Sequence, residues 1–67
     1  MGIFVMPSLR DIREKKFLTQ EELAQRAGLI VVTINRIENG RQKPRFKTIR
    51  KIAEALGIEP GDIEFKA

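Results

Sequence analysis

"LTQEELAQRAGLIVVTINRIENG", residues 18–40, is the stretch that decides the fold of this 67-residue chain. Thr19 followed three positions later by Glu22 is a capping box, which predicts the start of a helix over "QEELAQRAG". Gly28 is a natural end for that helix, because glycine accepts the left-handed backbone conformation that follows many helices. Almost no linker separates Gly28 from the next apolar repeat. The next helix must therefore follow through a tight turn.

That next helix is predicted from about Ile30 to Glu38. Ile34 and Ile37, three positions apart, form its core-facing side, and Asn39-Gly40 ends it. Two short helices joined through a glycine turn, followed by basic residues, form the pattern of a helix-turn-helix. This pattern alone is weak evidence, because many small helical bundles share it.

Further helices are predicted on both sides of this pair. Upstream, Ser8 and Asp11 form a second capping box, and the apolar side of the helix that it opens consists of Leu9, Ile12 and Phe17. Downstream, a helix after Pro44 is indicated by apolar residues at helical spacing: Phe46, Ile49, Ile52, Ala53 and Leu56. Gly57 closes it, and Pro60 suits the first turn of a short last helix, "PGDIEF".

The two ends of the chain are open to two interpretations. "IFVM" and "IEFK" are rich in β-formers and could pair as a small sheet, or they could be a loose arm and a packed helical end. We therefore expect an N-terminal arm or short strand over residues 1–7 and one all-α domain over residues 8–67.

Composition excludes several kinds of chemistry. The chain has no cysteine and no histidine, which excludes disulfides, thiolate chemistry and zinc sites built on these ligands. Its hydroxyl groups have no histidine base beside them, and no glycine loop suited to phosphate is present. We predict no enzyme activity, no metal and no cofactor. No apolar run approaches the roughly 20 residues of a membrane helix, and "GIFVM" lacks a preceding basic residue, so we expect a cytoplasmic protein without a signal peptide.

The net charge of +4 is unevenly distributed. Residues 36–51 carry seven basic side chains against Glu38 alone, a net charge of +6. Residues 52–67 carry one basic and four acidic side chains, a net charge of −3. A basic centre of this kind favours a surface for an anion, although a solvated face with chance clustering would look the same.

The motifs together resemble a known family. "LTQEELAQRAGL" followed by "TINRIENG", "KP" and "IRKIAEALGI" is similar to the phage repressor and Cro type (XRE-like) of helix-turn-helix DNA-binding domain, over roughly residues 8–64. The resemblance implies a compact five-helix bundle whose third helix enters the major groove of double-stranded DNA.

The resemblance also implies roles for individual residues. Gln20, at a helix N-terminus where free amides attract phosphate, would clamp the DNA backbone. Arg13 and Glu38 stand where similar domains place a buried ion pair. On the reading helix, Thr33 and Arg36 would contact bases or phosphates, with Asn35 nearer the flank. Backbone contacts would come from the loop residues Asn39, Arg41, Lys43 and Arg45. Each of these could also be an ordinary solvated residue.

The apolar start of the reading helix departs from the family pattern. Ile30 replaces the usual Ser or Thr cap, at a cost of about 1 kcal/mol. Val31 and Val32 stand where similar domains present polar side chains. Three interpretations stay open: contact with thymine methyl groups, packing on another protein, or weakened specific reading.

We therefore predict a sequence-specific DNA-binding transcriptional regulator, a repressor, that binds a palindromic operator as a homodimer. The acidic, apolar end would form the dimer interface, through Ile58, Pro60, Ile63 and Phe65. The alternative is an antitoxin-like protein-interaction module. Its partner would bind the surface of Ile30, Val31 and Val32, with DNA binding weak or secondary.

Overall fold

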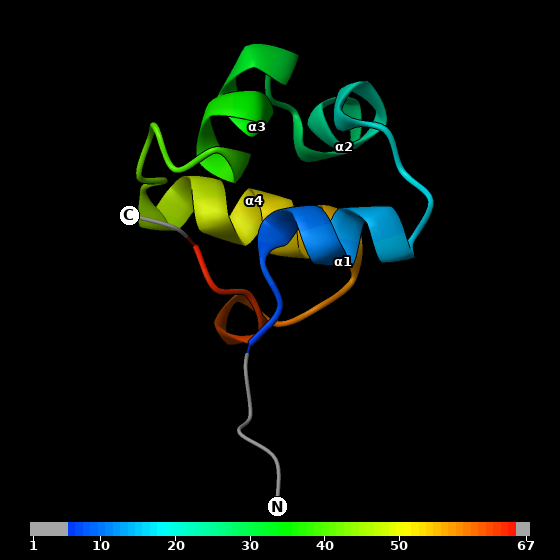
Figure 1. The fold of residues 1–67 in the computed structure, drawn as a ribbon, viewed down its shortest axis with the longest axis vertical. Helices are drawn as coiled ribbons and strands as arrows, with labels where there is room; N and C mark the ends of the chain where they lie inside the picture. Colours follow the sequence, from blue (N-terminus) through cyan, green and yellow to red (C-terminus); the bar gives the residue numbers. More distant parts are fainter. Residues whose placement is uncertain (1–5, 66–67) are drawn as a thin grey trace, which may run out of the picture.

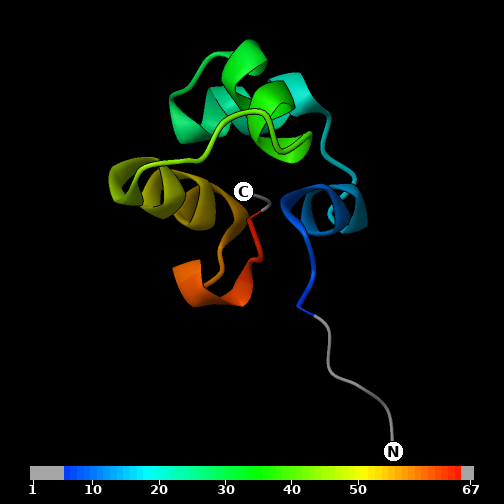
Figure 2. The ribbon, with the colours of Figure 1, turned by 60° about the vertical axis from the view of Figure 1, so that its left-hand side comes forward.

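Four α-helices and one 3-10 helix form the part of the chain, residues 6–65, that the computed structural model describes. In chain order they are α1 (Leu9–Lys15), α2 (Gln20–Ala27), α3 (Val31–Glu38), α4 (Phe46–Leu56) and η1 (Pro60–Asp62). α1 and α4 lie across the middle of the molecule (Figure 1), with α2 and α3 on one side of them and η1 on the other (Figure 2). The predicted all-α class is confirmed.

The first two helices begin where their capping boxes predict. Asp11 donates its backbone N–H to Ser8 Oγ at 3.2 Å, and Ser8 N–H donates to Asp11 Oδ2 at 3.3 Å. Thr19 and Glu22 repeat the arrangement at 3.0 and 2.9 Å. The hydrogen bonds with Thr19 lower the pKa of the Glu22 carboxyl below its ordinary value, because they favour its ionised form.

Each α-helix is followed by a residue with a left-handed backbone. After the last three helices this residue is a glycine, with φ of 69°, 71° and 69° at Gly28, Gly40 and Gly57 respectively. After α1 this residue is Phe17, with φ of 57°. Phe17 is 93 % exposed. The turn closes because Leu18 N–H donates to the carbonyl of Arg13 at 3.2 Å, which places the Leu18 side chain in the core.

Phe17→Asn is expected to raise the free energy of unfolding by about 1 kcal/mol. A left-handed backbone costs most L-residues about 1–2 kcal/mol, and asparagine tolerates it better than phenylalanine. Since Phe17 is almost fully exposed, its replacement sacrifices little packing. Urea unfolding followed by circular dichroism measures the change. Lys16→Asn is the control, because exposed Lys16 has an ordinary φ of −93°; an equal gain there would contradict the strain argument.

The core is made by one face of each helix. Leu23, Ile34, Ile37 and Ile52 are the largest fully buried side chains, and they are packed together with apolar residues of α1 and with Ile63. The predicted inward positions of α2 and α3 are confirmed. The apolar helix faces predicted for Phe17 and Phe46 are not confirmed. Phe17 lies beyond the end of α1, and Phe46, at the first turn of α4, is 84 % exposed.

One prediction about the C-terminal end is wrong, and one of the two interpretations of the chain ends is not supported among the described residues. The fifth helix is only the three-residue 3-10 helix η1, because the chain becomes extended at Ile63 (φ −115°, ψ 134°) to bury that side chain. Among residues 6–65 there is no strand either. The two ends of that segment meet in a single parallel bridge between Ser8 and Glu64, with Glu64 N–H donating to the Pro7 carbonyl at 2.9 Å. Most of "IFVM" lies outside the described residues.

Candidate nucleic-acid interface

Helix α3 is held from one side and open on the other. Ile34 and Ile37 are 0 % and 1 % exposed and fix the helix against the core. On the opposite side Val32, Asn35 and Arg36 are exposed. A helix anchored in this way offers a ridge of side chains that can enter a groove without loss of packing.

The apolar residues at the start of α3 differ in how exposed they are. Ile30 stands at the N-cap, makes no side-chain capping bond and is 68 % exposed, and α3 itself begins at Val31. Val32 is 47 % exposed, whereas Val31 is half-buried and packs against the core. The three residues therefore do not form one equally accessible apolar surface. Thr33, on the opposite flank, is half-buried as well.

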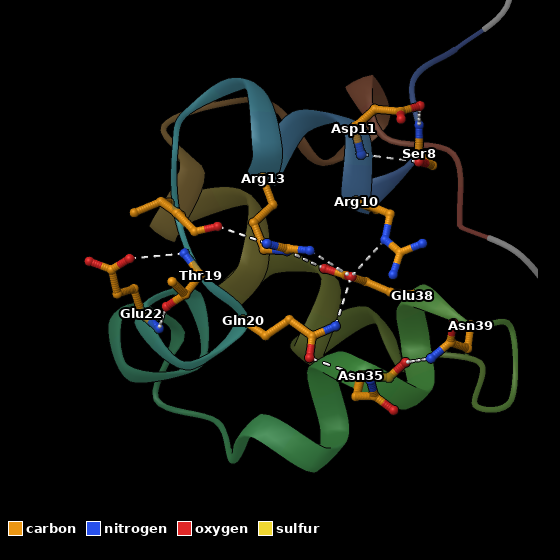
Figure 3. Close-up of polar contacts among 11 residues, drawn as sticks. Ser8, Arg10, Asp11, Arg13, Thr19, Gln20, Glu22, Asn35, Glu38 and Asn39 are labelled. Atoms are coloured by element: carbon orange, nitrogen blue, oxygen red, sulfur yellow. Dashed lines mark hydrogen bonds and ion pairs between the residues drawn. The ribbon is translucent and has the colours of Figure 1, made fainter.

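Arg13 and Glu38 form an ion pair in the interior between α1 and α3 (Figure 3). Arg13 Nε donates to Glu38 Oε2 at 2.6 Å, and Nη2 donates to Oε1 at 3.1 Å. Nη1 donates to the carbonyl of Leu18 at 2.8 Å. The hydrogen bond with Glu38 raises the pKa of Arg13, against the opposing effect of burial. This fork ties the C-terminal end of α3 to the scaffold.

The side chain of Gln20 lies within this polar network. Its Nε2 donates to Glu38 Oε1 at 3.0 Å, and its Oε1 accepts from Asn35 Nδ2 at 3.4 Å (Figure 3). The sequence suggested only a phosphate contact for Gln20 and, for Asn35, a DNA contact nearer the flank of the helix. The structure brings the two amides together and links both to the ion pair.

Arg10 is a member of this network that sequence reasoning missed. Its Nε lies 3.7 Å from Glu38 Oε1, while its side chain remains 55 % exposed. The available signal is its spacing, because Arg10 precedes Arg13 by three positions and so shares its helix face. It adds positive charge where the network reaches the surface.

The loop after α3 carries exposed basic residues, and hydrogen bonds to α3 and a buried proline hold its backbone in place. Asn39 Nδ2 donates to the Asn35 carbonyl at 2.9 Å, and Arg41 N–H donates to the Arg36 carbonyl at 2.9 Å, which together close the helix. Pro44 is buried and anchors the middle of the loop. The remaining predicted contact residues, Lys43 and Arg45, are exposed on either side of it.

The residues predicted as a dimer interface lie in different environments. Ile63 is 5 % exposed and belongs to the protomer's own core, so it offers little surface to a second copy. Ile58 and Phe65 are partly buried against that core, and Pro60 is exposed. The spacing of these residues could not reveal that the extended segment after η1 turns Ile63 inward.

Two features are absent among residues 6–65. No helix there has the length and apolar character needed to cross a membrane. The same residues contain no group of three or more acidic, histidine or cysteine side chains placed to hold a metal ion.

Two short helices joined at Gly28, with the second held by a buried ion pair and exposed on its far side, define a helix-turn-helix domain. The helix-turn-helix family model HTH_3 matches residues 9–63, and the chain belongs to this family. The resemblance inferred from the sequence motifs is thereby confirmed.

Known proteins agree with this assignment. The chain is 43% identical over 60 residues to the HTH-type transcriptional repressor RghR of Bacillus subtilis (strain 168), covering 88% of this chain and 44% of RghR. It is 45% identical over 51 residues to an uncharacterized HTH-type transcriptional regulator of Methanothermobacter thermautotrophicus, covering 76% and 74%. The chain thus spans less than half the length of RghR.

A solved structure shows the same fold. The crystal structure of the restriction-modification controller protein C.AhdI from Aeromonas hydrophila matches with a TM-score of 0.79 and 39% identity, covering 81% of this chain and 82% of that one. These relatives favour the DNA-binding interpretation over the protein-interaction module.

Proposed function

We propose that this chain is a non-enzymatic, sequence-specific regulator of transcription, a repressor, which inserts α3 into the major groove of double-stranded DNA. The observation that carries the proposal is the two-sided environment of α3. Ile34, Ile37 and Glu38 are buried, while Val32 and Arg36 face outward beside a basic loop. Such a protein would work in the cytoplasm, where its operator lies.

We expect some of these residues to contact bases and others to contact phosphates. Arg36 is suited to guanine, whose O6 and N7 accept two hydrogen bonds from one guanidinium. Val32 is exposed enough to touch a thymine methyl group, whereas half-buried Val31 contributes mainly to the seating of α3. Arg41, Lys43 and Arg45 would contact phosphates, which supply affinity without sequence information.

The dependence of DNA binding on salt tests this proposal. Binding should weaken steeply as salt rises, and Lys43→Ala should reduce the slope of log K against log salt by about 0.9, because one phosphate fewer is neutralised. The weakening should be alike on operator and random DNA, because a side chain that binds phosphate reads no base.

Lys15→Ala is the matched control, since it removes the same charge from an exposed position on α1. Its slope should change less than that of Lys43→Ala. Absence of binding to any duplex at about 50 mM salt, where such contacts are strong, would overturn the proposed function.

We further propose that the chain acts as a homodimer on a palindromic operator. A single eight-residue α3 spans only a few base pairs, and a two-fold axis places two reading helices about 34 Å apart, one turn of DNA. The candidate surface lies between α4 and η1, where a hollow of about 480 Å³ is lined by Phe46, Ile49, Arg50 and Pro60. Of the four residues expected from the sequence to form the dimer interface, only Pro60 lines this hollow.

Two features favour a second copy as the occupant of this hollow, an exposed aromatic ring and a pair of opposite charges. Phe46 lines the hollow and is 84 % exposed, so an exposed apolar ring and a hollow lie on one face, and two-fold rotation can bring each ring against the hollow of the other copy. Arg50 lines the same hollow, and acidic Glu59 precedes Pro60 in the chain. Rotation can therefore pair Arg50 of one copy with Glu59 of the other.

Phe46→Glu is expected to convert the dimer into monomers, because it places a charge in the apolar contact. Sedimentation equilibrium measures the molecular mass in solution. Phe17→Glu is the matched control, since Phe17 is the other strongly exposed phenylalanine among the described residues and lies at the end of α1. A native protein that sediments as a monomer, or a Phe46→Glu variant that remains dimeric, would contradict this surface.

A further inference from the structure

We propose that Asn35 reads an adenine, and that Glu38 sets the orientation of its amide through Gln20. The inference rests on the proposed function, because it assigns a base preference to the same DNA-binding helix. Its physical origin is a chain of hydrogen bonds in which each member determines the direction of the next: Arg13 to Glu38, Gln20 to Glu38, and Asn35 to Gln20.

The Glu38 carboxylate fixes the orientation of the Gln20 amide. The Glu38 carboxylate, paired with Arg13 at 2.6 Å, offers only acceptors to its neighbours. The Gln20 amide must therefore turn its nitrogen toward Glu38, and the Nε2–Oε1 distance is 3.0 Å. The reverse orientation would place two oxygens in contact beside a buried charge. Gln20 Oε1 is consequently directed to its other neighbour, Asn35.

Gln20 in turn fixes the orientation of the Asn35 amide. An acceptor at Gln20 Oε1 requires a donor opposite it, so Asn35 presents Nδ2 to Gln20, at 3.4 Å. This contact uses one of the two Nδ2 hydrogens. The other hydrogen and Oδ1 make no hydrogen bond with residues 6–65. Asn35 is exposed on α3, so this donor and acceptor pair faces outward from the domain.

The donor and the acceptor that Asn35 presents identify the base. One N–H donor and one carbonyl acceptor side by side complement adenine, which offers N7 as an acceptor and N6–H as a donor in the major groove. Guanine offers O6 in place of N6–H, so its oxygen would face Oδ1 of Asn35. If Asn35 could turn its amide freely, Nδ2–H could instead be directed to guanine O6, which would reduce this discrimination, and ordering the amide would cost affinity. The link through Gln20 restricts that rotation before DNA binds.

Selection of sites from a random duplex pool is the first test. The native protein is expected to select sites with an adenine at one fixed position in each half-site. Asn35→Ala should lose the preference at that base pair while keeping the others, and its adenine-over-guanine ratio should fall by about 5- to 150-fold. Gln25→Ala, which removes an exposed amide from α2 outside the network, should select the native site unchanged.

Two further measurements separate reading from structural support. Replacing the selected adenine by 7-deazaadenine removes N7, and it should weaken binding of the native protein but not weaken Asn35→Ala further. Gln20→Ala should lower the adenine-over-guanine ratio toward that of Asn35→Ala, in addition to any general loss of affinity.

The outcomes distinguish this inference from the proposed function. If the native protein selects no site at all, the proposed function fails. If it selects a site and Asn35→Ala selects the same one, only the inference about Asn35 fails. An equal loss of affinity on every DNA would make Asn35 a backbone contact and also overturn it. An unchanged base ratio in Gln20→Ala would overturn the orienting role of the network.

Discussion

Glu38→Ala is expected to lower the free energy of unfolding by about 3–5 kcal/mol, because it leaves the buried Arg13 guanidinium without a counter-charge. The Glu38 side chain is 0 % exposed and that of Arg13 only 10 %. Arg13 directs two of its three hydrogen bonds to Glu38, and Gln20 loses its acceptor as well. A loss of this size approaches the whole stability of a small domain.

Two comparison variants isolate the cause, and urea unfolding followed by circular dichroism measures all of them. Arg10→Ala removes the half-exposed partner at 3.7 Å and should cost about 0–1 kcal/mol, because water screens such pairs. The double change Arg13→Met with Glu38→Leu should be less destabilising than Glu38→Ala, since it leaves no unpaired charge. Equal losses for Glu38→Ala and Arg10→Ala would contradict a buried, uncompensated charge.

The accuracy of sequence interpretation here depends on how local each feature is. The capping boxes at Ser8 and Thr19 and the turn at Gly28 depend on residues within one helical turn, so the printed sequence is sufficient to predict them. An apolar residue at a helix end can face the core or the solvent. Which of the two it faces depends on packing against residues far away in the sequence. Phe46 fits the spacing of α4 but lies at its first turn, and it is 84 % exposed.

In the candidate site, too, local features could be predicted from the sequence and long-range contacts could not. The outward direction of Arg36 follows from the inward direction of Ile34 and Ile37 on the same helix. The contacts of Gln20 join residues 18 and 15 positions apart. They depend on how closely the start of α2 approaches the far half of α3, which no spacing rule determines. The link from Glu38 to Asn35 could therefore be found only in three dimensions.

Arg36→Ala is expected to weaken binding to the selected operator by about 1–3 kcal/mol, the range for one bidentate contact with a base. Binding to random DNA should change much less, because base contacts carry specificity and phosphate contacts carry general affinity. Arg36 is suited to this role because it is exposed on the side of α3 opposite the core, and its backbone carbonyl accepts from Arg41 N–H at 2.9 Å.

Dissociation constants for operator and random duplexes, measured at one salt concentration, separate the two kinds of contact for Arg36. Arg26→Ala is the matched control, because it removes an exposed arginine from the last turn of α2. It should have a small and equal effect on both duplexes, through long-range attraction alone. Equal losses for Arg36→Ala on operator and random DNA would make Arg36 a phosphate contact. Hydrogen-bonded specificity would then depend on the remaining polar side chains of α3.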